Sequence, residues 1–236
     1  MKTLPKAPFF ETGVKSYIYG DDVLKYAKAV DEAAIKYEID VLFIAPYTDI
    51  RRVIENTEKI IVTAPYMDTL RPGRGIADIL PEAIKASGAK GVILNHCEKV
   101  MSLPAIKQTI DRANELELFT FACADSLIEA KAIAQFHPDI INPEPSELIG
   151  TVNASDISYV KETLKLIKGM FPDILVEQAA GITNGAQVYE LLMIGNDGVG
   201  SASGILKSPN PIATLHDMLS NVKRAKDDLC KHKMQS

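Results

Sequence analysis

Val41-Leu42-Phe43-Ile44-Ala45 is an uninterrupted run of apolar residues. A strand with one face in water alternates apolar and polar residues, so an unbroken run is typical of a strand that is buried on both faces. Such strands occur in parallel sheets, whose faces are covered by the helices that connect successive strands. This stretch therefore predicts an α/β protein with a parallel sheet.

The alternation of strand and helix continues on both sides of this run. Helical apolar spacing, with glycine or proline at several ends, predicts helices at 21–37, 49–55, 79–87, 103–115, 126–136, 155–170, 185–193 and 211–230. Short apolar runs predict the remaining strands at 8–12, 60–64, 91–94, 118–122, 139–141, 174–177 and 198–200.

Eight such units in 236 residues, with no linker-like tract, predict a single domain (residues 1–236) that closes as a (β/α)8 TIM barrel. A doubly wound open sheet is the structural alternative. It usually carries a glycine-rich turn after its first strand, and Gly13 alone does not supply one. We therefore favour the barrel.

Composition narrows the classes of function. The net charge of −5 offers no basic surface for nucleic acid, and no apolar run approaches the length that spans a membrane. The three cysteines, Cys97, Cys123 and Cys230, lack metal-ligand spacing, and an odd number leaves one unpaired in any disulfide scheme. We expect a cytoplasmic protein with neither a metal nor a cofactor, and no membrane or nucleic-acid partner.

In a barrel, the functional groups lie on the loops that follow the strands. Polar side chains with complementary chemistry follow three of the predicted strands here: Lys15 after the first, Asn95, His96 and Glu98 after the fourth, and Glu144 after the sixth. Glu144 stands between two prolines, which stiffen its backbone. A cation, an imidazole and a carboxylate should therefore face one bowl.

Small residues follow the last two strands, at Ala180-Gly181 and at Ser201-Ala202-Ser203-Gly204. Backbone N–H groups of such turns, just before helices begin, bind anions, and barrel phosphate sites lie in these loops. Taken singly, a loop lysine, a lone histidine or a glycine turn is more often structural than functional. The combination is more specific, because independent strand ends supply groups that complement one another.

The same residues carry a resemblance to the triosephosphate isomerase family, in particular to its short, archaeal-type branch. The resemblance runs from Lys15 to the last helix, and its histidine and sixth-loop motifs are the specific ones. The matching stretches are Asn95-His96-Cys97-Glu98, Glu144-Pro145-Ser146-Glu147-Leu148-Ile149-Gly150-Thr151, Ala180-Gly181-Ile182-Thr183-Asn184-Gly185, Leu80-Pro81-Glu82-Ala83-Ile84-Lys85 and Ala202-Ser203-Gly204.

The resemblance implies an aldose–ketose isomerase that interconverts dihydroxyacetone phosphate and glyceraldehyde 3-phosphate. By similarity, Glu144 is the base, His96 polarises the carbonyl, and Lys15 stabilises the negative charge. Asn95 and Glu98 would support them. The small phosphorylated sugar would be bound by Gly13, Lys15, Ile149, Gly150, Gly181, Ala202 and Ser203. The resemblance also implies that the protein forms a homo-oligomer.

Three departures from the family pattern limit what can be carried over. Gly13 stands where the family has a substrate-contacting Asn, and Pro72-Gly73-Arg74-Gly75-Ile76-Ala77 lacks the Thr-Gly that the family inserts into a neighbouring subunit. Val152 replaces a glycine at the rear of the sixth loop. Two alternatives therefore stay open: an isomerase for a related sugar, such as a four-carbon ketose phosphate, and a non-catalytic phosphate-binding barrel.

Overall fold

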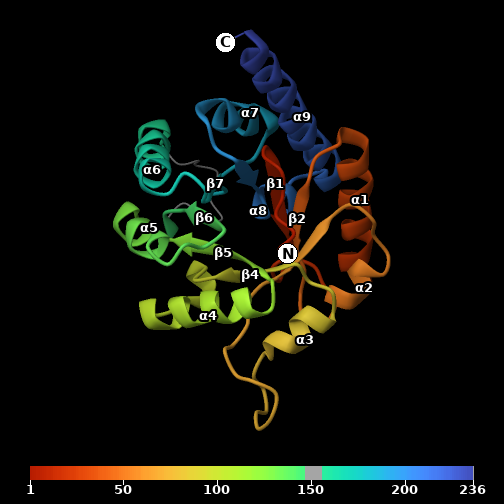
Figure 1. Cartoon of the computed structure of the whole chain (residues 1–236). Coiled ribbons are helices and arrows are strands. Elements are labelled where there is room, and N and C mark those ends of the chain that lie inside the picture. Colours follow the sequence, from red (N-terminus) through yellow and green to blue (C-terminus); the bar gives the residue numbers. More distant parts are fainter. Residues whose placement is uncertain (147–155, 236) are drawn as a thin grey trace.

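The computed structural model describes residues 1–146 and 156–235, with side chains described to residue 231. Within these ranges eight parallel strands form a closed barrel, in which each strand pairs with the next and the last pairs with the first. The predicted (β/α)8 barrel is confirmed (Figure 1). The strands are β1 (Phe9–Gly13), β2 (Val41–Ile44), β3 (Ile61–Ala64), β4 (Gly91–Leu94), β5 (Phe119–Ala124), β6 (Ile140–Pro143), β7 (Leu175–Gln178) and β8 (Gly198–Gly200).

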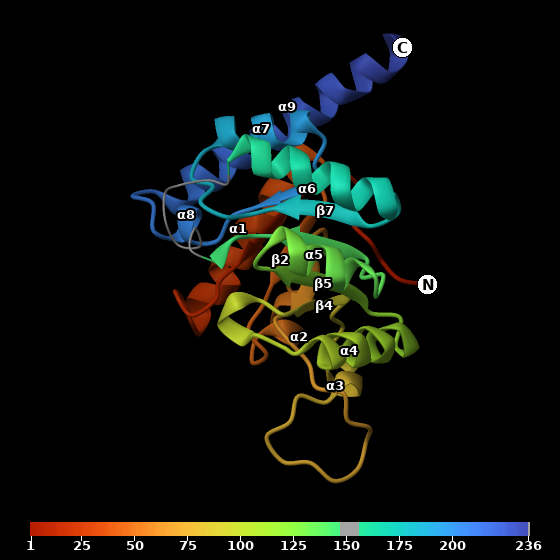
Figure 2. The ribbon, with the colours of Figure 1, turned by 90° about the vertical axis from the view of Figure 1, so that its left-hand side faces the viewer.

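Helices surround the ring of strands (Figure 1). They are α1 (Asp21–Tyr37), α2 (Ile50–Ile54), α3 (Pro81–Ala86), the 3-10 helix η1 (Cys97–Lys99), α4 (Leu103–Glu115), α5 (Leu127–Ala134), α6 (Ile157–Met170), α7 (Gly185–Ile194), α8 (Ser203–Leu206) and α9 (Pro211–Gln235). The far end of α9 projects beyond the barrel (Figure 2). No helix in the described part of the chain has the length and apolar character needed to cross a membrane.

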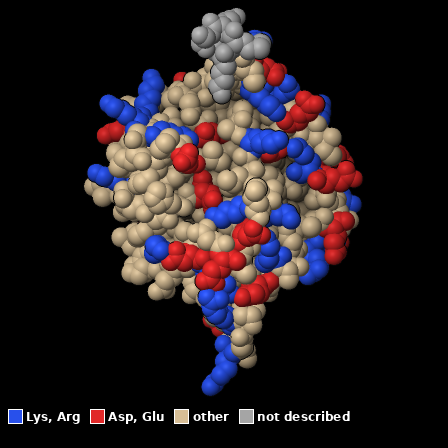
Figure 3. Space-filling view, in the orientation of Figure 1, with Lys and Arg blue, Asp and Glu red and all other residues tan. Residues whose placement is uncertain are grey.

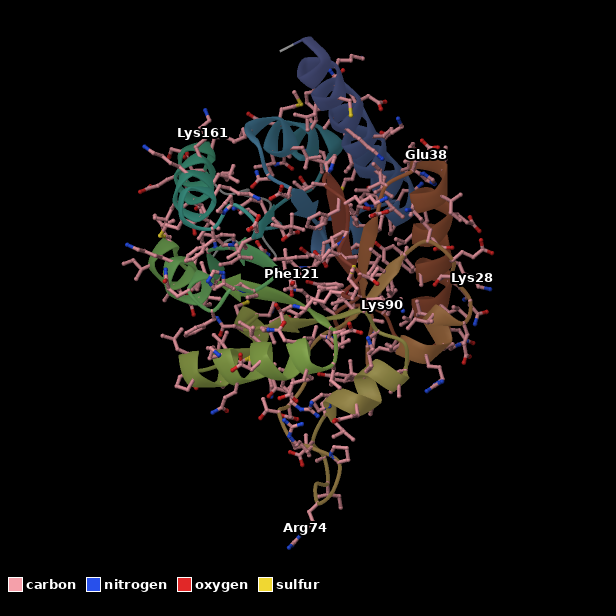
Figure 4. The ribbon with its side chains drawn as sticks, in the orientation of Figure 1. Lys28, Glu38, Arg74, Lys90, Phe121 and Lys161 are labelled. Carbon is pink, nitrogen blue, oxygen red and sulfur yellow. The ribbon has the colours of Figure 1, made fainter. Side chains whose placement is uncertain are left out.

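Side chains fill the inside of the barrel, so it is a packed core and not a pore. Glycines on two strands make room for this packing. A methyl group at Gly91 would collide with the ring of Phe119, and one at Gly198 would collide with the ring of Phe9. Figure 4 shows Phe121 inside the ring of strands. The buried members of this inner cluster are Phe9, Leu42, Ile93, Phe119, Phe121, Cys123 and Ile140.

The two ends of the barrel differ. In Figure 2, α8 and the loops that follow the strands lie on one side, and the N-terminus lies on the other. The face in Figure 3 mixes Lys and Arg with Asp and Glu and shows no broad region of one sign. The functional end is therefore expected among the loops on the side of α8.

The segment between β3 and α3 projects away from the barrel (Figures 1 and 2), with Arg74 at its tip (Figure 4). Two hydrogen bonds close its neck: the Asp68 N–H donates to the Ile79 carbonyl at 3.0 Å, and the Ile79 N–H donates to Asp68 Oδ2 at 2.7 Å. Ile76, within the segment, is 92% exposed. An apolar side chain is thus displayed on a projecting arm.

Asp49 precedes α2, but its side chain makes no capping hydrogen bond to that helix. Its carboxylate instead accepts a hydrogen bond from the Thr48 hydroxyl at 2.8 Å. The neighbouring hydroxyl competes for the carboxylate, as polar side chains near helix ends often do.

Candidate active site

A cavity of about 700 Å³ occupies the end of the barrel at which the strands finish. Its lining comes from β1, β2, β4, β5 and β6 and from the loops that follow every strand except β5. The structure brings together there every described residue predicted for the site except Asn95. Ile149, Gly150 and Val152 lie outside the described residues. The predicted residues that line the bowl are Gly13, Lys15, His96, Glu98, Glu144, Gly181, Ala202 and Ser203.

Glu144 is held at the end of β6 with little access to water. Its N–H donates to the Ala124 carbonyl at 2.8 Å, and Asn142 Nδ2 donates to Glu144 Oε2 at 3.0 Å. Burial raises the pKa of Glu144 to about 7, although Lys15 and the Asn142 hydrogen bond both lower it. A carboxylate with this pKa is suited to removing and returning a proton near neutral pH.

His96 is neutral in this environment. Burial, reinforced by Lys15 and opposed by Glu98, lowers the pKa of His96 to about 4. The Glu98 N–H donates to Nδ1 at 3.1 Å, so the single proton of the neutral ring is on Nε2. Glu98 Oε2 lies 3.6 Å from Nδ1, but a neutral ring makes no ion pair with it. The imidazole can therefore donate from Nε2 without carrying a charge.

Lys15 stands on an unusual backbone. Its φ is 44°, a conformation that residues other than glycine seldom adopt and that is concentrated at functional sites. Its ammonium is 3.4 Å from Glu98 Oε1, and the Glu98 side chain is 61% exposed. A pair so exposed adds little stability, so its main effect is to direct the lysine over the bowl.

Asn95 supports the fourth loop from behind. It has a φ of 56°, which asparagine tolerates better than most residues. Its Oδ1 accepts from the Met101 N–H at 2.8 Å, and its Nδ2 donates to the Cys123 carbonyl at 3.1 Å and to Glu129 Oε1 at 3.0 Å. These bonds fasten the turn that presents His96 to β5 and α5.

The backbone at Gly13 leaves no room for the amide side chain that the resemblance implies at this position. A methyl group there would lie 2.9 Å from Cβ of Ile44 on the next strand, closer than real Cβ contacts come. Ile44 also lines the bowl. The apolar side chain of Ile44 therefore lies beside position 13, and a residue with a side chain at 13 would require Ile44 to shift or to be replaced by a smaller residue.

The loops after β7 and β8 approach each other closely. Gly181 has a φ of 67°, and Ser201 Oγ donates to the Ile182 carbonyl at 2.7 Å. A methyl group at Gly204 would lie under 3.0 Å from that same carbonyl oxygen. Glycine is needed at 204 for this close approach, which brings the Gly181 turn beside the start of α8. The arrangement has the form of a barrel anion site.

Sequence reasoning missed three polar residues in or beneath the bowl: Glu11, Asn142 and Glu177. Glu11 and Asn142 line the cavity. Glu11 and Glu177 fall within the predicted strands 8–12 and 174–177, and Asn142 directly follows the strand 139–141, so none of the three stands on a loop that predicts a role. A usable signal was present, because Glu11 and Glu177 interrupt otherwise apolar strands that are buried on both faces.

Comparison with known proteins agrees with this geometry. A family model described as triosephosphate isomerase matches residues 9–193. A triosephosphate isomerase of Sulfurisphaera tokodaii is 33% identical over 230 residues, covering 94% of this chain and 98% of the relative. One of Methanocaldococcus jannaschii is 34% identical over 203 residues, covering 85% and 92%.

Among solved structures, a triosephosphate isomerase from Bartonella henselae superposes with a TM-score of 0.74 at 19% identity. The match covers 92% of this chain and 99% of the other. At this level of identity the likeness concerns the fold.

Proposed function

Since the chain belongs to the triosephosphate isomerase family, we propose that Glu144, His96 and Lys15 interconvert dihydroxyacetone phosphate and glyceraldehyde 3-phosphate in the bowl. The chain is accordingly an aldose–ketose isomerase. One observation carries the assignment of roles. A carboxylate with a pKa near neutrality, a neutral imidazole and an ammonium come from three strand ends and line one cavity.

Glu144 acts as the base. It takes a proton from the carbon beside the substrate carbonyl, and the electrons of that C–H bond form the double bond of an enediolate. The same carboxyl then returns the proton to the neighbouring carbon. Its raised pKa supports both steps, because a group that titrates near the working pH accepts and donates protons with comparable ease.

His96 acts on the oxygens. Its Nε2–H donates to the carbonyl oxygen and stabilises the negative charge that develops there. A neutral imidazole is also able to move a proton between the two enediolate oxygens. The use of a neutral histidine in this reaction is a known example of pKa tuning, and the low pKa of His96 supports it.

Lys15 supplies the positive charge of the bowl. Its ammonium would stabilise both the enediolate and the phosphate. The phosphate itself would be held by N–H groups at Gly181, Ala202 and Ser203, where the two closely packed loops support an anion site. Ile149 and Gly150 are assigned to the same phosphate by the family resemblance.

A related, longer sugar phosphate is a second candidate substrate. The lining of the cavity of about 700 Å³ also includes Tyr47, Tyr66 and Asp68. The missing amide at Gly13 removes one contact that would position a triose. A non-catalytic barrel is less well supported, because mere phosphate binding has no use for Glu144 and His96.

We extend the proposal to assembly and location. A homo-oligomer is supported by the projecting arm between β3 and α3, which displays Ile76. A cytoplasmic location is supported by the cysteines, all three of which are unpaired.

A coupled assay tests the proposed reaction. Wild type should isomerise glyceraldehyde 3-phosphate, and Glu144→Asp, which withdraws the carboxylate by one methylene, should reduce kcat by at least about 100-fold. Four-carbon sugar phosphates run in parallel would reveal the second candidate. If wild type turns over none of these substrates, the proposed function is wrong.

A further inference from the structure

Two glutamates meet inside the barrel just beneath the bowl, Glu11 on β1 and Glu177 on β7. A methyl group at Gly200, on the strand between them, would lie under 3.0 Å from both Glu11 Oε2 and Glu177 Oε1. The two oxygens are therefore less than twice that distance apart, on either side of the space that the glycine leaves. Glu11 is 6% exposed and Glu177 is 0% exposed.

Glu11 and Glu177 cannot both be ionised at neutral pH. Burial and the Glu144 carboxylate raise the proton affinity of both Glu11 and Glu177, and the Glu11 carboxylate also raises that of Glu177. Lys15 is the cation that opposes this effect at Glu11. Three ionised carboxylates facing one ammonium in a space from which water is largely excluded would be strongly unfavourable. The pair must hold at least one proton near neutral pH.

Polar atoms around the pair still lack partners. Neither oxygen of Glu177 has a hydrogen bond within the described structure, and neither does Oδ1 of Asn142, a residue that is 3% exposed and lines the bowl. Buried polar atoms are nearly always paired, so unpaired ones in a binding cavity indicate that a ligand completes them. Among these residues Asn142 lines the bowl, so its unpaired Oδ1 indicates a place for a polar ligand there.

We propose that Glu11 is protonated at neutral pH and donates a hydrogen bond to the sugar phosphate from the floor of the bowl. Glu11 is the member of the pair that lines the cavity, whereas Glu177 lies behind it. Glu11 is accordingly a substrate-contacting residue, and Glu177, also protonated, is a positioning residue that lies beside it without adding a negative charge. The inference rests on the proposed function, because it names a further donor for the same substrate.

This role accounts for the missing amide. Oε1 of Glu11 lies 3.6 Å from the point where a side chain at Gly13 would begin. A neutral carboxylic acid and an amide both offer one donor beside one acceptor. A carboxylic acid kept neutral by its apolar surroundings is a known donor in enzymes that stabilise enolates. The acid on the floor of the bowl therefore supplies the hydrogen bond that the residue above it has lost.

Burial and the charge of Glu144 raise the pKa of Glu11 to about 8. The titratable groups that act on it come from several elements. Lys15 and Glu144 lie above it, Glu177 beside it, Cys123 on β5, and Tyr26 on α1. Burial raises the pKa of both Cys123 and Tyr26, so these two stay neutral across the neutral range. The proton of Glu11 is thus the one expected to leave first as the pH rises above neutrality.

The test compares the pH profile of kcat/KM in three variants. Wild type should lose activity as the pH rises through about 8, because the donor is lost. Glu11→Gln, whose amide donates without titrating, should stay within about tenfold of wild type and lose this alkaline limb. Glu11→Leu should fall by about 100-fold, the usual effect of removing one such donor. Glu190→Gln, on the exposed surface of α7, is the matched control for carboxylate removal.

Glu177→Gln probes the positioning role. The amide is neutral, as the protonated carboxyl of Glu177 is, so the alkaline limb of Glu177→Gln should stay at about pH 8. The inference is overturned if this limb is lost in Glu177→Gln, which would assign the titrating proton to Glu177, or if Glu11→Gln and Glu11→Leu are equally active and both keep it.

Infrared spectroscopy separates this inference from the proposed function. The protonated acids should give the C=O stretch of a carboxylic acid in the spectrum of wild type minus Glu11→Gln/Glu177→Gln at pH 7. Absence of this band overturns the inference even if the enzyme is fully active. If no triose phosphate is turned over, the donor role falls with the proposed function. If turnover is normal but the limb is unaffected in both Glu11 variants, only the inference fails.

Discussion

Glu144 and His96 have pKa values displaced in opposite directions, and burial is the main cause for both. Burial disfavours the charged form of any group, so it makes a carboxyl a weaker acid and an imidazolium a stronger one. The same enclosed bowl therefore prepares a base and a neutral donor side by side. Lys15 and Asn142 then lower the pKa of Glu144, and Lys15 lowers the pKa of His96 further.

At the residue scale, Asn142 should influence the pH below which kcat/KM falls. Its hydrogen bond favours ionised Glu144, so Asn142→Leu should raise the pKa of this carboxyl. Only the ionised form is a base, and wild-type kcat/KM should fall as the pH drops through about 7. In the variant this fall should begin at higher pH. An acid limb at the wild-type position would contradict the role of Asn142.

His96 should remain neutral at every pH at which the enzyme works. A titration of its ring nitrogens by NMR should show no protonation above about pH 5, in line with the pKa of about 4. Lys15→Met should raise this pKa, because the ammonium disfavours a second positive charge nearby. His137, on the outside of the barrel, serves as an internal reference. Protonation of His96 near pH 6 in wild type would rule out the neutral donor.

At the scale of elements, the close approach of the β7 and β8 loops gives a test with a matched control. Gly204→Ala would press a methyl group against the Ile182 carbonyl, so the KM for the sugar phosphate should rise, and unfolding should become easier by about 1–3 kcal/mol. Gly169→Ala, near the end of α6 with open space around it, should be neutral or stabilising by up to about 1 kcal/mol. Kinetics and denaturant unfolding measure both variants.

The strands were largely predictable, because a strand buried on both faces, such as Val41–Ile44, consists of consecutive apolar residues. Glu144, His96 and Lys15 were found because each follows a strand, and in a barrel that position alone brings them together. Glu11 and Glu177 were not found from the sequence, because their proximity depends on how β8 pairs with both β1 and β7 when the barrel closes. The same holds for Gly13 and Ile44, whose contact crosses between strands.

At the scale of the whole molecule, the buried acids should make stability depend on pH. Burial, chiefly, raises the pKa of Glu177 well above its ordinary value, so the folded protein keeps a proton that the unfolded chain releases. Wild type should therefore lose stability as the pH rises from about 4.5 towards 8. The glutamine in Glu177→Gln does not titrate. Over this window the free energy of unfolding of the variant, relative to that of wild type, should therefore increase by up to about 1.4 kcal/mol per pH unit. Thermal unfolding at several pH values measures the difference.

Assembly is tested on the projecting arm. If Ile76 is covered by another copy, Ile76→Asp should reduce the sedimentation coefficient, because a charge buried in an interface is costly. Ile128→Asp, on α5, changes an 83% exposed isoleucine elsewhere and should leave the coefficient unaltered. Identical sedimentation of both variants and wild type would show that the arm has another role.

Gly200 also has a consequence for the history of this barrel. Its missing side chain leaves the space in which acids from the two flanking strands lie, so a larger residue there would have to displace a carboxylate. We therefore expect positions 11, 177 and 200 to change together among related sequences. Covariation of these three positions among related sequences would record when the acid pair arose.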